Sequence, residues 1–240
     1  MAIMKISSKD NPLIKYLTKI YSSKKERDES SKFIVEGYNL VNEAYKTGSI
    51  DKIFSIKEEP LYKDAIIVTY DIIKKITDTV TPEGIIALVN KKNTSKCGNK
   101  ILYLDSLQDP GNIGTLLRSA VAFNFDTIVL DECTDLYNPK TIRASQGAIF
   151  YLNFIDKKIL DLKQENYYII NTNMNGVSLD NFKLKSSNYV LILGNEGHGV
   201  RREYQECSDV NLTIPMENIE SLNVSIAGSI LMYELNKQEK

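Results

Sequence analysis

The chain has 240 residues, of which 42% are hydrophobic and 25% are charged, so it can bury one large core or two small ones. Its formal net charge is −1, but residues 1–100 carry 18 Lys and Arg against 13 Asp and Glu, whereas residues 101–240 carry 12 against 18. The three cysteines (Cys97, Cys133 and Cys207) are odd in number and widely spaced, which argues against a disulfide framework and against a zinc site.

The N-terminal sequence has no apolar segment of signal-peptide length, and no apolar run approaches the roughly 20 residues that span a bilayer. We therefore expect a cytoplasmic protein with no membrane partner and no metal. A basic part followed by an acidic part is typical of an RNA-facing module joined to a catalytic module. A Lys-rich solvated surface would give the same charge count, so this signal alone is weak.

In the first part, apolar residues at helical spacing predict a helix over 11–23, and the charged stretch KKERDESSK after it predicts a loop. Periodicity then predicts strands and helices in alternation. The strands are 33–37, 52–56, 65–69 and 83–90, and the helices are 39–48 and 71–78. The polar segment 91–100 has no periodicity, so we predict two domains, 1–95 and 96–240.

In the second part, nearly continuous apolar runs separated by helical patterns predict strands that are covered on both faces. Such alternation predicts an α/β fold with an open, mostly parallel sheet and helices on both sides. Ligands bind at the carboxyl ends of the strands in sheets of this kind. The runs are 101–105, 127–131, 148–155, 167–173, 189–194 and 210–214.

The first loop of interest follows Asp105, where the turn-rich stretch DPGNIG precedes a predicted helix. Glycines in this stretch let the backbone approach a ligand closely. Asn112 offers an amide at the mouth of the helix. Arg118 stands among apolar residues of the same helix, which is a less expected place for an arginine than an exposed surface.

The second loop, Gly194–Gly199, follows a buried strand, and its spacing differs from the dinucleotide fingerprint. Glu196 would be partly desolvated there and would require a partner. His198 is the single histidine of the chain, but a lone histidine in a Gly-rich turn is at least as often a surface residue. In the third loop, Pro215 ends a strand and Ser221 is the predicted N-cap of the last helix.

Together these loops resemble the three motifs of the SpoU family of SPOUT methyltransferases: NIGTLLRSA (112–120), LGNEGHG (193–199) and IPM…SLNVSIA (214–227). The stretches FIVEGYNLVNEAY and TPEGIIALV resemble the substrate-binding domain of that family. The resemblance implies a catalytic domain with a C-terminal trefoil knot, S-adenosylmethionine as cofactor, and methyl transfer to a ribose 2′-hydroxyl of RNA. It also implies a homodimer with the site at its interface.

The resemblance also implies roles for single residues. Arg118 matches the catalytic arginine, and the polar residues around it are Asn112, Glu196, Ser221 and Asn223. The expected cofactor-binding residues are Gly194, Ile214 and Leu222, through their backbone, together with Thr172 and Met216. Arg143, in the segment 139–150, is a less specific candidate for contact with RNA.

A guanidinium with a pKa above about 12 is a poor general base, so our hypothesis is that Arg118 orients and polarises the 2′-hydroxyl through the adjacent phosphate. In this hypothesis Glu196 and Asn112 hold its side chain. A full N-terminal domain favours rRNA as substrate. The alternatives are a tRNA substrate, a catalytically silent RNA-binding member of the fold, and a general nucleotide-binding domain, which the absent dinucleotide fingerprint disfavours.

Overall fold

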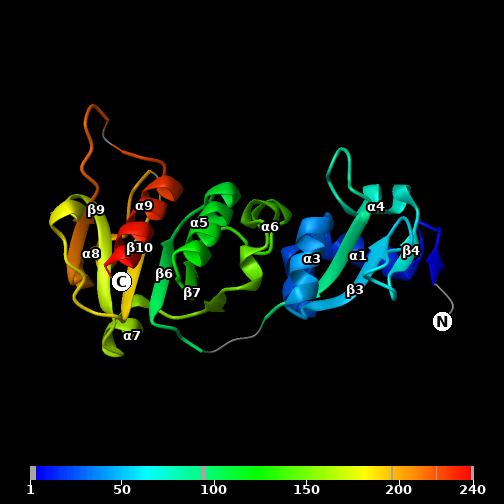
Figure 1. Cartoon of the computed structure of the whole chain (residues 1–240), viewed down its shortest axis with the longest axis horizontal. Helices are drawn as coiled ribbons and strands as arrows, with labels where there is room; N and C mark the ends of the chain where they lie inside the picture. Colours follow the sequence, from blue (N-terminus) through cyan, green and yellow to red (C-terminus); the bar gives the residue numbers. More distant parts are fainter. Residues whose placement is uncertain (1–3, 93–95, 196, 220, 239–240) are drawn as a thin grey trace. The chain divides into compact units, whose positions relative to one another are not determined.

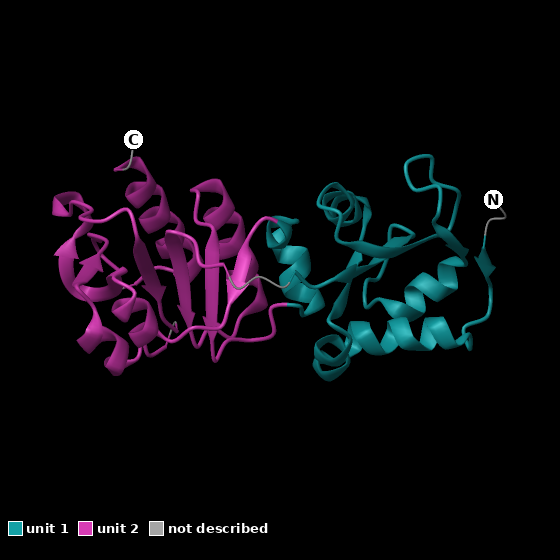
Figure 2. Cartoon of the chain, turned by 90° about the horizontal axis from the view of Figure 1, so that it is seen from below, with its two compact units in different colours: residues 1–92, 137–150 teal, residues 93–136, 151–240 magenta. Residues whose placement is uncertain are grey.

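The computed structural model describes residues 4–92, 96–195, 197–219 and 221–238. The chain divides into two compact units (Figure 2). Unit 1 consists of residues 1–92 and 137–150, and unit 2 consists of residues 93–136 and 151–240. The division at 92 lies close to the predicted one at 95, but no pattern in the sequence indicated that 137–150 packs with the first unit.

The described part of unit 1 contains a mixed five-stranded sheet in the order β1-β4-β3-β5-β2 (Figure 1). Strand β5 is antiparallel to both of its neighbours, whereas β4 is parallel to β1 and β3. The strands are β1 (Lys5–Ile6), β2 (Lys32–Glu36), β3 (Ile50–Ser55), β4 (Ile66–Val68) and β5 (Ile85–Asn90). The helices are α1 (Pro12–Ser22), α2 (Lys24–Ser30), α3 (Tyr38–Lys46), α4 (Tyr70–Ile76), α6 (Pro139–Ser145) and the 3-10 turn η1 (Ala148–Phe150).

Helix α1 forms where the periodicity predicts it. The Asn11 side chain accepts a hydrogen bond from the backbone N–H of Leu13 at 2.9 Å, and Pro12 occupies the first turn, where it has no N–H to lose. The apolar stripe of the helix is fully buried in the core of unit 1 at Ile14, Leu17 and Ile20. A period of 3.6 residues therefore predicts both the helix and the face that it buries.

The prediction of a loop at KKERDESSK was wrong, because residues 24–30 form helix α2. Ser23 caps it by accepting a hydrogen bond from the backbone N–H of Glu26 at 3.4 Å. Arg27 is buried, and its Nη1 donates to the backbone carbonyls of Ile20 and Tyr21 at 2.8 Å each. Arg27 thus provides hydrogen bonds to two carbonyls in the last turn of α1. A run of charged residues in the sequence does not reveal that one of them is buried in this role.

Segment 137–150 packs on strand β2 through aromatic side chains. The Phe33 ring lies 4.8 Å from the ring of Tyr137 and 6.2 Å from that of Phe150, measured between centroids. Residues 148–150 form the buried turn η1, so the predicted strand 148–155 is real only at β8 (Asn153–Ile155). An apolar run does not by itself distinguish a buried strand from a buried turn.

Arg143 is held within unit 1 and is not a free cation. Its Nη1 donates to Tyr21 Oη and to Asp78 Oδ1, both at 2.9 Å. Burial and the hydrogen bond to Asp78 together raise the pKa of Tyr21 to about 12. Arg143 thus ties α6 to Tyr21 of α1 and to Asp78, but its side chain is still 36% exposed, and contact of Arg143 with RNA stays a prediction.

The described strands of unit 2 form a six-stranded sheet in the order β11-β9-β10-β6-β7-β8, and every pairing among them is parallel (Figure 1). The predicted open parallel sheet is confirmed, and the trefoil knot stays a prediction. The remaining strands are β6 (Lys100–Asp105), β7 (Thr127–Asp131), β9 (Tyr168–Ser178), β10 (Tyr189–Leu193) and β11 (Val210–Thr213). The helices are α5 (Pro110–Ala122), α7 (Ile159–Gln164), α8 (Arg202–Cys207), α9 (Val224–Lys237) and the 3-10 turn η2 (Leu179–Asn181).

Helices α5 and α9 lie side by side in unit 2. A Cβ on Gly228 of α9 would come within 3.0 Å of side-chain atoms of Leu193 and Leu116, so the missing side chain lets the helix lie close to both. Ser119 and Ser229 hydrogen-bond across the helix pair at 2.7 Å. No helix in the described part of the chain is long and apolar enough to cross a bilayer.

Candidate functional site

A cavity of about 440 Å³ opens in unit 2 at the carboxyl ends of its parallel strands. Three stretches that are far apart in the sequence line it. They are residues 172–174 of β9, residues 193–195 and 197–200 at and after the end of β10, and described residues of the segment that runs from 212 into α9, with Gln205 of α8 beside them. The volume lies within the roughly 300–1,000 Å³ typical of small-molecule sites.

All five residues that the sequence proposes for the cofactor line this one cavity. They are Thr172, Gly194, Ile214, Met216 and Leu222. Ser221 lines it as well, although the sequence placed this residue among the catalytic group. Because these residues span 51 positions from first to last in the chain, their convergence is a property of the folded sheet and not of local spacing.

The loop after β10 turns back tightly on Gly194. A Cβ on this residue would lie well under 3.0 Å from backbone atoms of Gly199 and Val200. The N–H of Gly199 donates to the carbonyl of Asn195 at 2.8 Å, and Gly199 has a φ of +70°. Both glycines are therefore required by the backbone, one by the close approach and the other by the left-handed conformation.

Two amide side chains that the sequence analysis missed fix the same loop. Asn195 donates through Nδ2 to the carbonyl of Ser106 at 3.0 Å, which ties the loop to the end of β6. Gln205 donates through Nε2 to the carbonyl of Val200 at 2.6 Å and accepts from Asn173 Nδ2 at 3.1 Å. The glycine-rich motif marked the loop in the sequence, but no pattern indicated which amides hold it.

Two residues of this loop carried expectations from the sequence. Glu196 lies outside the described residues. His198 lines the cavity and is exposed, in keeping with its exclusion from the central role.

Asn112 and Asn223 join α5 to the cavity wall. Asn223 Nδ2 donates to Asn112 Oδ1 at 3.0 Å. Asn223, and not Ser221 as predicted, is the N-cap of α9, because its Oδ1 accepts from the backbone N–H of Ser225 at 2.9 Å. Since Leu222 lines the cavity and Asn223 is the next residue, this hydrogen bond fixes the start of α5 beside the cavity.

Arg118 lies on α5 and is exposed. Helix α5 begins at Pro110, with Asp109 as its N-cap, so it starts earlier than the sequence indicated. Arg118 is six positions after Asn112, which is about 9 Å along the helix axis and places the two residues on different faces. Within the described chain Arg118 forms no hydrogen bond or ion pair with Asn112 or any other residue, so its guanidinium is available to a ligand.

A buried ionic cluster holds the far end of the cavity loop. Arg201 donates its backbone N–H to Asp105 at 2.8 Å and its Nε to the same carboxylate at 2.6 Å. Its Nη2 donates to Asp131 at 2.5 Å. Asp105 is fully buried and Asp131 is 7% exposed. Asp131 also accepts hydrogen bonds from Tyr103, Tyr204 and Lys158.

The cluster keeps Asp131 ionised. Burial by itself raises the pKa of Asp131, but hydrogen bonds from Tyr204, Tyr103 and Lys158, with the charge of Arg201, lower it to about 2. Burial and the hydrogen bond to Asp131 raise the pKa of Tyr204 to about 12, so this phenol stays a donor at neutral pH. Among the described residues, no group of acidic, His and Cys side chains has the arrangement of a metal site.

We expect Arg201→Leu to lower the free energy of unfolding by about 3–5 kcal/mol, because it leaves the buried Asp105 without a cation and Asp131 with Lys158 alone. Chemical denaturation of the full chain measures the change. The matched control is Arg202→Leu, since Arg202 is 90% exposed and pairs only with Glu206 in the described chain. That control should change stability by no more than about 0.5 kcal/mol. Equal stability of the two variants would contradict the role of the cluster.

Comparison with known proteins agrees with this site. Residues 99–233 match the model of the SpoU rRNA Methylase family, and residues 11–87 match that of the MRM3-like substrate binding domain. The chain is 34% identical to the 23S rRNA (guanosine(2553)-2′-O)-methyltransferase RlmP of Bacillus subtilis, with 96% of this chain and 98% of that protein covered.

Solved structures share the whole architecture. An AdoMet-bound rRNA methyltransferase from Sinorhizobium meliloti superposes with a TM-score of 0.85 at 26% identity, covering 98% of each chain. An RNA 2′-O ribose methyltransferase superposes with a TM-score of 0.81 at 27% identity, covering 98% of this chain and 99% of the other. The family match spans more than half of the chain and includes all three loops of the site, so this protein belongs to the SpoU rRNA methylase family.

Proposed function

We propose that this protein transfers a methyl group from S-adenosylmethionine to a ribose 2′-hydroxyl of rRNA. The observation that carries the proposal is the single cavity that the five expected cofactor residues line. It is supported by 34% identity to a 23S rRNA 2′-O-methyltransferase over almost the full length of both proteins. Such an rRNA methyltransferase works where ribosomes are assembled, so we place the protein in the cytoplasm.

The cavity fits the cofactor in size and in the character of its walls. Leu193, Leu212, Ile214, Leu222 and Val224 give it apolar surface for an adenine ring. Among the described residues that line it, none is Asp, Glu, Lys or Arg. Recognition would therefore rest on shape, on uncharged polar side chains and on backbone groups of the loop that Gly194 lets turn back tightly.

When bound, the cofactor supplies a methyl group on a sulfonium, which is a strong electrophile. The chain must orient the 2′-hydroxyl and assist the loss of its proton. We assign the orientation to Arg118, because the planar set of donors on a guanidinium suits a phosphate beside the hydroxyl. Asn112 and Asn223 would fix the helix that carries Arg118 next to the cavity through their 3.0 Å hydrogen bond.

We also propose that two copies of the chain pair through α5 and α9. Ile226 is 53% exposed and Tyr233 is 48% exposed on α9, beside the helix that carries Arg118. Apolar exposure of this kind on the surface of a helix is typical of an interface. Pairing there would bring Arg118 of each copy to the contact between them, which agrees with its lack of partners in the single chain.

We expect Ile226→Asp to convert the dimer to a monomer and to remove methyl transfer, because a carboxylate cannot be buried unpaired in an apolar contact. Analytical ultracentrifugation measures the mass. Leu160→Asp is the matched control, since Leu160 is 60% exposed on α7. A wild-type chain that sediments as a monomer, or an Ile226→Asp variant that stays dimeric, would refute this interface.

Unit 1 is assigned to binding the rRNA, in agreement with the match to a substrate-binding domain over 11–87 and with the excess of Lys and Arg in residues 1–100. The function is tested by mapping 2′-O-methyl sites in rRNA from cells with and without the protein. A site lost from rRNA supports the proposal. A site lost only from tRNA favours the tRNA alternative, and no lost site together with no transfer by the purified chain indicates a silent member.

A further inference from the structure

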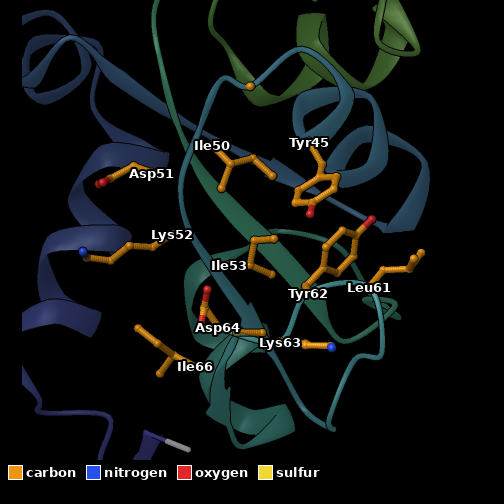
Figure 3. A pocket seen from close by; sticks show the side chains of 12 residues that line it. Tyr45, Ile50, Asp51, Lys52, Ile53, Leu61, Tyr62, Lys63, Asp64 and Ile66 are labelled. Carbon is orange, nitrogen blue, oxygen red and sulfur yellow. The ribbon is translucent and has the colours of Figure 1, made fainter. Parts of the chain in front are cut away.

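A second cavity, of about 700 Å³, lies wholly within unit 1, far in the sequence from the residues of the cofactor site (Figure 3). It is bounded by the end of α3, the first half of β3, and the segment 61–66 that leads into β4. Of the residues that line it, only Tyr45 lies in a stretch that resembles the family's substrate-binding domain, as the last residue of FIVEGYNLVNEAY, and that resemblance gives it no role. Its chemistry therefore needs its own explanation.

Two tyrosine rings form the aromatic part of this cavity, one of them buried (Tyr62) and the other exposed (Tyr45). The centroids of Tyr45 and Tyr62 lie 5.1 Å apart at an interplanar angle of 66°. Tyr62 is buried, and its backbone is held by hydrogen bonds to Glu59 and Ala65. Tyr45 is 52% exposed and Leu61, which lies beside the rings, is 71% exposed. The exposed ring of Tyr45 packs against the buried ring of Tyr62 on one side, so its free surface can stack on a flat ligand.

The charged part of the cavity favours a ligand with phosphates. Lys52 and Lys63 are exposed, and neither forms a salt bridge with a described residue. Asp51 is neutralised by Lys32, whose Nζ lies 2.7 Å from its carboxylate. The remaining carboxylate, Asp64, is exposed and can accept hydrogen bonds from an exocyclic amino group of a base.

The backbone of β3 is open on the side of the cavity. Strand β4 pairs with β3 only at Phe54–Ile66 and Ser55–Ile67. The stretch Ile50–Ile53 therefore has a strand neighbour on its β5 side alone. Such an edge offers N–H and C=O groups to a sugar or to the edge of a base. A peptide strand could use the same edge, but it would not need an open aromatic ring and two unpaired lysines.

We propose that this cavity binds one unpaired nucleobase of the rRNA substrate, stacked on Tyr45 and Leu61, with the flanking phosphates at Lys52 and Lys63. Single-stranded RNA is recognised in this way, because an unstacked base exposes its flat face to an aromatic ring and its edge to polar groups. The proposal rests on rRNA being the substrate. The proposal places this part of rRNA binding at a site in unit 1 that is separate from the cofactor cavity.

The test uses the full chain and unmethylated rRNA purified from cells that lack the protein. Tyr45→Ala should raise the KM for rRNA about ten-fold, the effect of losing one base–aromatic stack, and leave kcat and the KM for S-adenosylmethionine unchanged. Tyr45→Phe should restore the wild-type KM. Tyr70→Ala is the matched control, since Tyr70 is 42% exposed in the same unit and does not line the cavity. Equal KM values for Tyr45→Ala and Tyr70→Ala would overturn the proposal.

A second measurement does not depend on methyl transfer. RNA carrying 4-thiouridine, cross-linked to the wild-type chain, should label peptides that contain Tyr45 or residues 61–63. Cross-links confined to other peptides, or none at all, would overturn the cavity proposal. Labelling at the cavity without any methyl transfer would instead contradict the proposed reaction and leave the cavity proposal standing. Tyr45→Ala that fails only on assembled ribosomal particles, and not on free rRNA, would assign the cavity to a protein partner and overturn the proposal.

Discussion

Replacing Gly194 by alanine is expected to weaken S-adenosylmethionine binding by at least about 100-fold, equivalent to about 2.7 kcal/mol, and to remove methyl transfer. The new Cβ would lie well under 3.0 Å from the backbone of Gly199 and Val200, so the loop that lines the cavity must open. Backbone atoms cannot move aside as a flexible side chain can. Isothermal titration calorimetry with the cofactor measures the affinity.

The matched control lies in the same loop. A Cβ on Gly197 would approach only Asn195 Oδ1, at 3.4 Å, so Gly197→Ala should keep cofactor affinity within about three-fold. Since Gly194→Ala can also destabilise the unit, Ala227→Phe offers a second variant that fills the cavity from α9 without straining the loop. Wild-type cofactor affinity in both Gly194→Ala and Ala227→Phe would show that the cofactor binds elsewhere.

Replacing Arg118 by alanine is expected to reduce kcat for methyl transfer by about 100- to 1,000-fold, the effect of removing one group that stabilises charge in a transition state. Cofactor affinity should not change, because Arg118 does not line the cavity. Arg118→Lys should recover part of kcat, since it restores the charge but not the planar pair of donors. Single-turnover transfer of a labelled methyl group to rRNA separates this step from binding.

Arg202→Ala is the matched control for Arg118, since Arg202 is 90% exposed on α8 and is not part of the proposed site. It should transfer methyl groups at the wild-type rate. An Arg118→Ala variant that keeps the wild-type kcat would remove Arg118 from the reaction. A variant that loses cofactor affinity and kcat together would indicate a structural role for Arg118.

Because segment 137–150 packs in unit 1, the assignment of rRNA binding to unit 1 and of cofactor binding to unit 2 cannot be tested by a simple deletion. Deletion of residues 1–95 would expose Ile142, Ile149 and Phe150, which are buried within unit 1. It would also remove Tyr21 and Asp78, the partners of Arg143. A deletion therefore disturbs a segment that is continuous with unit 2, and single surface variants such as Tyr45→Ala give a cleaner answer.

The loops of the site were readable in the sequence because they follow buried strands directly, whereas the single cofactor residues within them came from the resemblance to the SpoU family. Gly194 comes after the apolar run of β10, and Ile214 and Met216 come after that of β11. In a parallel sheet the carboxyl ends of neighbouring strands meet at one edge, so the order of strands and loops places these residues together. The helix N-cap was read less well, since Ser221 and Asn223 are both good caps and only the backbone conformation distinguishes them.

The amino-acid sequence by itself determined the strand–helix alternation, the parallel sheet and two of the loops that line the cofactor cavity, those after β10 and β11, since these depend on periodicity and on short motifs. The tertiary structure alone decided the pairing of Arg201 with Asp105, 96 residues away, and the packing of segment 137–150 in unit 1. It also decided the placement of Tyr45 against Tyr62. These features depend on contacts between distant residues, which form only when the core is packed and which leave no periodic trace in the chain.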